Sequence, residues 1–120
     1  MSEYVYQEER LHDFLDEMKQ LLGSHYEELS VTKQFPLNPN YERYLELQDE
    51  GSLFCLTCRK DGELIGYILY FLYRHLHYWD CLTAMEDLYF IRKNERQGRI
   101  GLKLFTEAEK ALKLSLIHIS

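Results

Sequence analysis

The segment between Leu88 and Phe105 has residue types and spacing that suit anion binding. An apolar stretch comes first, then a basic stretch with two glycines, then apolar residues at helical spacing. Five of the chain's 14 basic residues fall here, opposed only by Glu95: Arg92, Lys93, Arg96, Arg99 and Lys103. A helix that follows such a turn directs backbone N–H groups and its positive dipole end outward, which favours phosphate. The alternative is a solvated basic loop at the end of a strand.

Two carboxylates, Glu86 and Asp87, precede this segment. Adjacent residues of a strand face opposite sides, so we expect one of the two at most to reach a substrate cleft. A carboxylate there could act as a general base. The alternative is a carboxylate at a strand end that binds water or pairs with Arg74.

His75 and His77 are two residues apart and are expected on one face of a strand. They suit substrate contact or a proton relay, and a purely structural role stays open. No third His, Cys or carboxylate stands at a spacing that completes a metal site, so no metal is expected. Cys55 and Cys58 form a Cys-x-x-Cys pair, but on a strand they face opposite sides and are expected in the core.

The hydrophobic pattern predicts a helix, a second helix, three strands and a third helix. The first helix is predicted from Leu11 to Leu22, ending at Gly23, with a short segment capped by Ser24 and Glu27 after it. For the second helix, Asn38 and Pro39 are the expected N-cap and first residue, and Gly51 the end.

The three strands are predicted near 53–60, 64–78 and 82–91, as an antiparallel meander. Asp61-Gly62 is a type I′ hairpin signal, and Gly66 is a candidate bulge. The last helix is predicted over about 100–113.

Composition narrows the class of protein. At 120 residues the chain is one domain at most, and its 46% hydrophobic content fits a globular core. The net charge of −6 argues against general nucleic-acid binding. No apolar run reaches the roughly 18 residues of a membrane helix, and no secretory signal is visible at the start. An odd number of cysteines, three, favours a reduced cytoplasm over a secreted disulfide scaffold.

Arg96-Gln97-Gly98-Arg99-Ile100-Gly101 resembles the acetyl-coenzyme A motif of the GNAT superfamily of N-acetyltransferases, Arg/Gln-x-x-Gly-x-Gly/Ala. The final glycine matches at Gly101, whereas Gly98 comes one position early and Arg99 fills its place. The order of elements also resembles this family over nearly the whole chain, with a first strand expected at Tyr4–Gln7. Four segments resemble a phage-type branch: 36–44, 62–67, 75–78 and 87–90.

The resemblance implies an α+β fold, part of an acyl-CoA N-acyltransferase fold with an antiparallel meander flanked by helices. It implies acetyl transfer from acetyl-CoA to a primary amine of a small molecule or protein. The implied catalytic residues are Asp87, Glu86, His77 and His75. The implied cofactor-binding residues are Leu88, Phe90 and Ile91 on the strand, then Arg96, Gln97, Gly98, Arg99, Ile100, Gly101 and Leu102.

The tail departs from the family pattern, which continues for a further strand, a fourth helix with a tyrosine general acid and a final hairpin. The last seven residues, Leu-Ser-Leu-Ile-His-Ile-Ser, match what a common sequencing-adapter sequence encodes. We therefore expect residues 1–113 to be a partial acetyltransferase domain from a phage or bacterial metagenomic source. Residues 114–120 are then an expected non-native tail, and activity of the fragment is expected to be impaired; the alternative is that 116–119 form a true fifth strand.

Two other functions stay open. One is a non-catalytic module that binds acyl-CoA or a protein partner, and the other is an unrelated α+β protein whose basic turn binds a different nucleotide. The expected partners are an amine acceptor and, as an open possibility, a second copy of the chain, with no nucleic acid and no membrane.

Overall fold

The computed structural model describes residues 4–29, 40–74, 76–77, 82–96, 98–115 and 117–119. Five strands, three helices and one 3₁₀ turn lie in these ranges. In chain order they are β1 (Tyr4–Glu8), α1 (Leu11–Leu29), α2 (Tyr41–Asp49), β2 (Leu53–Lys60), β3 (Glu63–Arg74), β4 (Leu82–Ile91), η1 (Lys93–Glu95), α3 (Ile100–Leu114) and β5 (His118–Ile119). The predicted first strand, meander and last helix are confirmed.

The strands form one sheet in the order β1-β2-β3-β4-β5. Strands β1 to β4 pair antiparallel, and β5 pairs parallel to β4. Asp61 and Gly62, between β2 and β3, both have positive φ, 54° and 82°, as the predicted type I′ turn requires. The fold is therefore α+β, with a meander at its centre.

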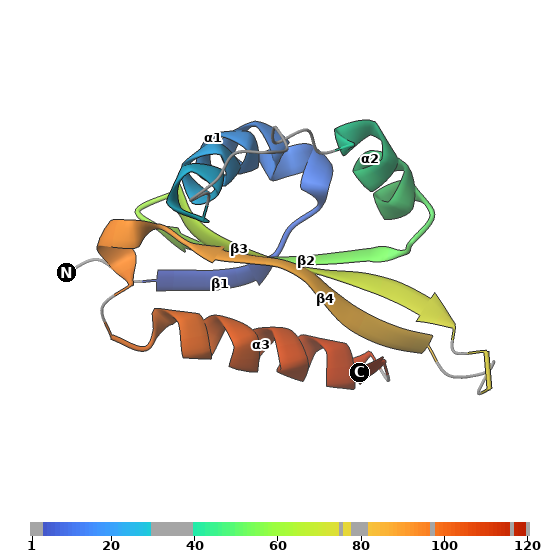
Figure 1. Cartoon of the computed structure of the whole chain (residues 1–120). Coiled ribbons are helices and arrows are strands. Elements are labelled where there is room, and N and C mark those ends of the chain that lie inside the picture. The colour runs from blue at the N-terminus through green and yellow to red at the C-terminus, as the bar shows by residue number, and fades with distance from the viewer. Residues whose placement is uncertain are drawn as a thin grey trace.

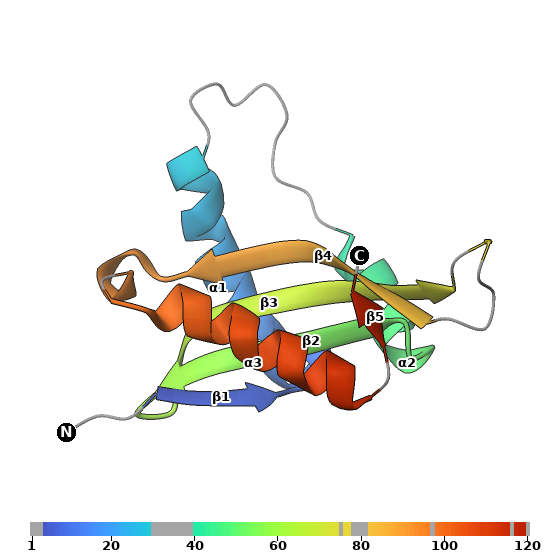
Figure 2. The same cartoon turned by 90° about the horizontal axis from the view of Figure 1, so that it is seen from below.

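Helices cover both faces of the sheet (Figure 1), with α1 and α2 on one face and α3 on the other. We call these the α1–α2 layer and the α3 layer. Seen from the α3 side (Figure 2), α3 lies across the central strands. Strands β2 and β3 are buried on both faces because both layers pack on them. Buried side chains in the α1–α2 layer include Phe14, Met18, Tyr67 and Phe90. The α3 layer includes Ile68, Ile91, Leu104 and Ala108.

Two predicted helix boundaries are wrong. Helix α1 continues through Gly23 to Leu29 instead of ending there, so the separate segment capped by Ser24 does not form. An internal glycine costs about 1 kcal/mol relative to alanine, which the burial of Leu21 and Leu22 just before it offsets. The N-cap of α2 is Asn40, whose side chain accepts a hydrogen bond from the Arg43 N–H; Asn38 and Pro39 lie outside the described residues.

Irregularities in β3 and β4 bear on the site. The pairing of β2 with β3 shifts next to Gly66, the predicted bulge position. A Cβ on Gly66 would lie 3.0 Å from the Phe90 carbonyl oxygen, so glycine allows the close approach of β4. A second shift, in the pairing of β3 with β4, leaves Asp87 as an extra residue between Glu86 and Leu88.

Strand β3 ends at Arg74, four residues before the predicted end. The last pair of this ladder joins Arg74 to Leu82, where β4 begins, and Leu76 and His77 lie in a bend outside the sheet. At the other end of the chain, α3 extends to Leu114 and β5 pairs with Thr83 and Ala84 of β4.

Candidate active site

The basic turn joins the end of β4 to the start of α3. The N–H of Arg92 makes a 2.7 Å hydrogen bond to the carbonyl of Ile65 and closes the β3–β4 ladder. The 3₁₀ turn η1 follows, and Gly98 has a φ of +86°, in the left-handed region that glycine enters most easily. Helix α3 then begins at Ile100, and Arg99 in the N-cap position provides no side-chain cap.

The first turn of α3 keeps its N–H groups unoccupied within the described part of the chain. The N–H groups of Ile100, Gly101 and Leu102 make no hydrogen bond there, whereas that of Lys103 bonds to Arg99. No acidic residue lies in this turn. The Leu102 side chain is exposed and that of Ile100 is buried, so Ile100 offers only its backbone. Such N–H groups can donate to an anion, and we call this turn the anion site.

The basic side chains differ in their surroundings. Arg92 forms an ion pair with Glu63, and Lys103 lies over the ring of Tyr6. Arg96 donates from Nε to the carbonyl of Ile91 at 2.7 Å, and its guanidinium lies over the Phe90 ring. Arg99 is exposed next to the helix start, with no hydrogen bond or ion pair to its side chain among the described residues.

Gln97 lies outside the described residues. Among the residues predicted to bind the cofactor, the structure therefore brings together Arg96, Gly98 and Arg99 with the N-terminal turn of α3.

Glu95, the one acid of the turn, is turned away from the start of α3. The Tyr4 hydroxyl donates to its carboxylate at 2.9 Å, and Lys60 Nζ lies 3.5 Å from it. Tyr4 and Lys60 belong to β1 and β2, so Glu95 fastens the turn to the far edge of the sheet. Its charge is offset there by Lys60, which keeps the turn positive.

The edge of β4 that faces β5 is largely open in the described part of the chain. Strand β5 pairs only with Thr83 and Ala84. Because the Arg92 N–H bonds to β3, strand alternation turns the peptide groups of Phe90 and Leu88 toward β3 and those of Ile91 and Tyr89 toward the open edge. The open edge therefore offers the peptide groups of Tyr89 and the N–H of Ile91, whose carbonyl already accepts from Arg96.

Tyr89 joins the open edge to the start of α3. Its ring packs on Phe105, with 4.6 Å between centroids. A Cβ on Gly101 would lie 2.1 Å from the Tyr89 hydroxyl, so that hydroxyl rests against the first turn of α3. Burial raises the Tyr89 pKa. Gly101 is thus a position of close packing beside the anion site.

The two candidate bases lie on opposite faces of β4. Glu86 pairs with Tyr70, a residue of the α3 layer, and is exposed. Asp87, at the bulge, faces the α1–α2 layer, where the Tyr44 hydroxyl donates to its Oδ2 at 2.6 Å. Burial and then the neighbouring carboxylate raise the Tyr44 pKa, so the phenol stays protonated and acts as the donor.

Tyr44 was not predicted as a site residue. Its place in the apolar pattern of α2 gave it a core role, and nothing in the local sequence links it to a residue 43 positions away.

Among the described residues, His77, Cys55 and Cys58 add no further group to this site. His77 is exposed in a bend after β3 instead of on the strand, and His75 lies outside the described residues. Cys55 and Cys58 are buried in opposite layers, as predicted, and burial raises their pKa values to about 12 and about 11. Among the described residues, no three His, Cys, Asp or Glu side chains are grouped to hold a metal.

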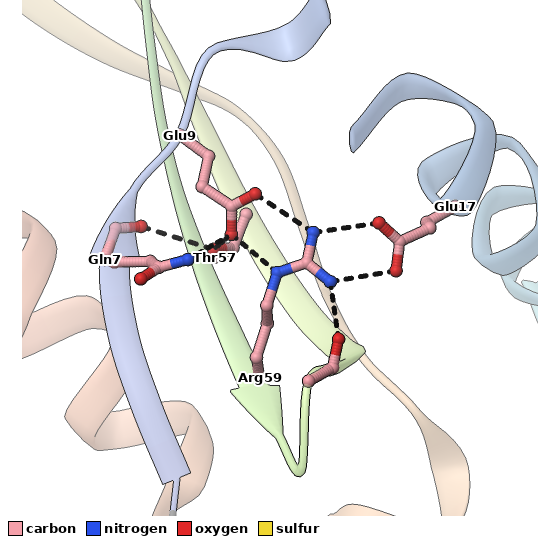
Figure 3. Close-up of polar contacts among 6 residues, drawn as sticks. Gln7, Glu9, Glu17, Thr57 and Arg59 are labelled. Atoms are coloured by element: carbon pink, nitrogen blue, oxygen red, sulfur yellow. Dashed lines mark hydrogen bonds and ion pairs between the residues drawn. The ribbon is translucent and has the colours of Figure 1, made fainter. Parts of the chain in front are cut away.

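A second polar cluster, at the junction of β1, α1 and β2, is satisfied internally (Figure 3). Arg59 donates all five of its N–H groups: two to Glu9, two to Glu17 and one to the Gly62 carbonyl. Thr57 donates to Glu9 as well. With its donors used, this cluster fastens β1 and α1 to β2 and has no free group for a ligand.

In the described part of the chain, a strand–turn–helix junction with free N–H groups, an open strand edge and a carboxylate on β4 are the features that the sequence resemblance led us to expect together. The chain belongs to the GNAT acetyltransferase family, whose model matches residues 15–118. The interpretation as an unrelated α+β protein is therefore wrong. A search of curated protein sequences finds no match.

Solved structures with the same fold include several acetyltransferases. An aminoglycoside acetyltransferase from an uncultured soil metagenomic sample has 14% identity and a TM-score of 0.77, over 97% of this chain and 74% of the other. A ribosomal-protein-alanine N-acetyltransferase from Brucella melitensis biovar Abortus 2308 has 17% identity and a TM-score of 0.77, over 98% and 76%. A predicted acetyltransferase with acetyl-CoA from Clostridium acetobutylicum has 10% identity and a TM-score of 0.75, over 98% and 79%. At these identities the likeness concerns the fold.

Proposed function

We propose that this protein transfers the acetyl group of acetyl-CoA to a primary amine of a small molecule or a protein. The observation that carries this proposal is the uncapped first turn of α3 beside Arg96 and Arg99, at the end of the open edge of β4. The family membership supports the same reaction class. No helix in the described part of the chain is long and apolar enough to cross a membrane. The cytoplasm stays our proposed compartment, on the odd cysteine count.

The residues present fit a coenzyme A. Its pyrophosphate would be held by the N–H groups of Ile100, Gly101 and Leu102 and by charge-assisted bonds from Arg96 and Arg99. Its pantetheine amides would pair with the Tyr89 peptide groups and the Ile91 N–H, as a peptide adds to a sheet edge. When bound, acetyl-CoA supplies an activated thioester.

Asp87 would take the proton of the attacking amine. Its bulge position aims it into the α1–α2 layer, and its Oδ1 has no hydrogen-bond partner among the described residues. About four residues of strand, roughly 13 Å, separate Asp87 from Ile91. In this proposal the anion site follows the end of β4 and the base lies near the middle of the same strand.

The acceptor is proposed as a cationic or neutral primary amine. An acidic chain, with a net charge of −6, attracts amines more than acids. The aminoglycoside and ribosomal-protein enzymes with this fold act on amines of both the small-molecule and the protein kind.

A direct assay tests the function. The chain is incubated with acetyl-CoA and a polyamine, an aminoglycoside or a peptide amine in turn, and release of the coenzyme A thiol is followed. We expect amine-dependent release above the rate of hydrolysis. Acetyl-CoA binding by calorimetry without release would favour the non-catalytic binding module, and absence of binding would contradict both proposals.

A parallel assay tests the proposed tail. The uninterrupted reading frame beyond Lys113 is determined and the corresponding longer chain is assayed beside this one. Greater activity of the longer chain would support a non-native tail over residues 114–120, and a frame that reproduces the same seven residues would contradict it.

A further inference from the structure

The hydrogen bond from Tyr44 to Asp87 joins α2 to the bulge of β4. The donor and acceptor oxygens are 2.6 Å apart, which is short for a hydrogen bond and typical of a hydroxyl donating to a carboxylate. Among the described residues, no Arg, Lys or His forms an ion pair with Asp87 and no other hydrogen bond reaches its carboxylate. The Tyr44 hydroxyl is thus the group that fixes its orientation there.

The position of Tyr44 is itself fixed by packing and by the ends of α2. The Tyr44 ring stacks on Phe71, with 5.9 Å between centroids and 19° between planes. Asn40 caps the start of α2. Near its end, the Gln48 side chain accepts a hydrogen bond from the Leu11 N–H at 2.7 Å. The hydroxyl therefore comes from a helix held at both ends and has little freedom to leave Asp87.

The hydrogen bond from Tyr44 makes the two carboxylate oxygens of Asp87 different. Oδ2 accepts from Tyr44, and Oδ1 is left without a partner in the described part of the chain. The other titratable groups of this layer that lie near Tyr44 are Tyr41 and Tyr67, both phenols with pKa values raised first by burial, so both are neutral donors. Lys19 lies over the Tyr41 ring, 4.8 Å from its centroid.

We propose that Tyr44 is a positioning residue for acetyl transfer: it holds Oδ2 of Asp87 and so presents Oδ1 to the amine of the acceptor. This inference rests on the proposed function. Tyr44 also ties the orientation of the base to α2, a helix that belongs to neither the anion site nor the open edge.

A proton-donor role for Tyr44 toward the leaving thiolate is disfavoured by proton affinities. An ordinary thiol has a pKa of about 8.5 and an ordinary phenol one of about 10. The Tyr44 pKa lies higher still because the ring is buried beside a carboxylate. Proton transfer from Tyr44 to the thiolate is therefore uphill, and a hydrogen bond that persists through the reaction is the better use of this hydroxyl.

The test is a double-mutant cycle with Tyr44→Phe and Asp87→Asn, assayed by steady-state kinetics. Tyr44→Phe keeps the ring on Phe71 and removes only the hydroxyl. We expect its kcat to fall about tenfold to a hundredfold, the usual effect of one hydrogen bond to a charged group. The KM for acetyl-CoA should stay unchanged.

Tyr41→Phe is the matched control. Tyr41 lies on the same helix, is partly buried, and makes no hydrogen bond to Asp87 in the structure. We expect this variant to keep both the wild-type kcat and the wild-type KM for acetyl-CoA. In the Asp87→Asn background, Tyr44→Phe should have little further effect on kcat, because Tyr44 acts through the charge of Asp87.

Urea unfolding of the wild type, Tyr44→Phe, Asp87→Asn and the double variant gives a readout that does not depend on catalytic activity. The effects of Tyr44→Phe and Asp87→Asn on the free energy of unfolding should be non-additive, as for two groups in contact. Additive effects in unfolding, a raised KM for acetyl-CoA in place of a lowered kcat, or equal effects of Tyr44→Phe and Tyr41→Phe on kcat would overturn the inference. If Asp87→Asn leaves turnover unchanged, the assigned base is wrong; if it lowers turnover but Tyr44→Phe does nothing, only the positioning role is wrong.

Discussion

Asp87 stands at the one place where the side-chain alternation of β4 breaks. As the extra residue of a bulge, it shares the α1–α2 side of the sheet with Leu88, whereas Glu86 faces α3. A bulge redirects a side chain and locally bends and twists the strand that carries it. At this scale, a single extra residue places a carboxylate where Tyr44 can hold it.

Asp87→Asn removes the proton acceptor and nearly keeps its shape. We expect turnover to fall by about 10² to 10⁴, the usual contribution of a general base, with acetyl-CoA binding unchanged. The loss should shrink as pH rises, because more of the acceptor amine is then already neutral. Steady-state kinetics at several pH values, with calorimetry for the cofactor, make the measurement.

Glu86→Gln is the matched control for Asp87→Asn. Since Glu86 faces the α3 layer, this change should do little. The reverse pattern would transfer the role to Glu86. Equal small effects would point to water or a histidine, with His77 and His75 tested next.

Strand alternation predicted that Glu86 and Asp87 face opposite sides, and the structure agrees. The Tyr44 partner could not be predicted in this way. A hydrogen bond across a helix–sheet interface depends on how α2 packs on the sheet. Hydrophobic spacing predicts that Tyr44 faces inward, but it does not predict the hydrogen-bond partner of the Tyr44 hydroxyl.

The basic turn and the start of α3 act together as one element. Replacing both Arg96 and Arg99 by alanine should weaken acetyl-CoA binding tenfold or more, since charge-assisted hydrogen bonds contribute roughly 1.5–3 kcal/mol each. Calorimetry at low and high salt measures the effect. Lys110→Ala with Lys113→Ala removes the same charge from the far end of α3 and should leave binding nearly unchanged. Unchanged binding in the arginine variant at both salt concentrations would contradict the assignment of the turn.

Glu95 is the acid that this element must keep away from an anion. Lys60→Met removes the positive charge 3.5 Å from its carboxylate. We expect weaker acetyl-CoA binding, more so at low salt, where charges are less screened. Adding Glu95→Gln to Lys60→Met should restore the affinity, because no acid then remains in the turn. A double variant that binds as weakly as Lys60→Met would mean that Lys60 acts in another way.

Helical spacing, the Asp61-Gly62 turn and the apolar strands predicted the elements that position the site. The failures lie where a local signal competes with packing. Gly23 is a residue type that often ends a helix. Helix α1 nevertheless continues past it, because the inward face of α1 is buried just before Gly23. The sequence after Arg74 suits a strand, but Leu76 and His77 lie in a bend outside the sheet.

At the scale of the whole molecule, the two layers meet the sheet through different contacts. The α3 layer packs mainly through apolar side chains, whereas α1 and β1 are also tied to β2 by the Arg59 cluster. Partners 42 to 50 residues apart build this cluster, so sequence spacing gave no sign of it. The side chains of Arg59 and Glu9 are only 15% and 11% exposed, so this ion pair is shielded from solvent far more than an ordinary surface ion pair.

The Glu9 carboxyl should make folding stability depend on pH. Burial acts to raise its pKa, but hydrogen bonds from Arg59, Gln7 and Thr57 outweigh burial and lower it from 4.5 to about 2. A carboxyl with a lowered pKa stabilises the fold fully above its unfolded-state value and loses that contribution as pH falls through its folded value. We therefore expect the free energy of unfolding to fall by up to about 3 kcal/mol between pH 5 and pH 2 on account of this group.

Urea unfolding across this pH range makes the measurement. The Glu9→Gln variant, whose residue 9 cannot titrate, should be less stable than the wild type at pH 7, and its free energy of unfolding should depend less on pH. A variant with the wild-type slope would show that other carboxyls control acid unfolding.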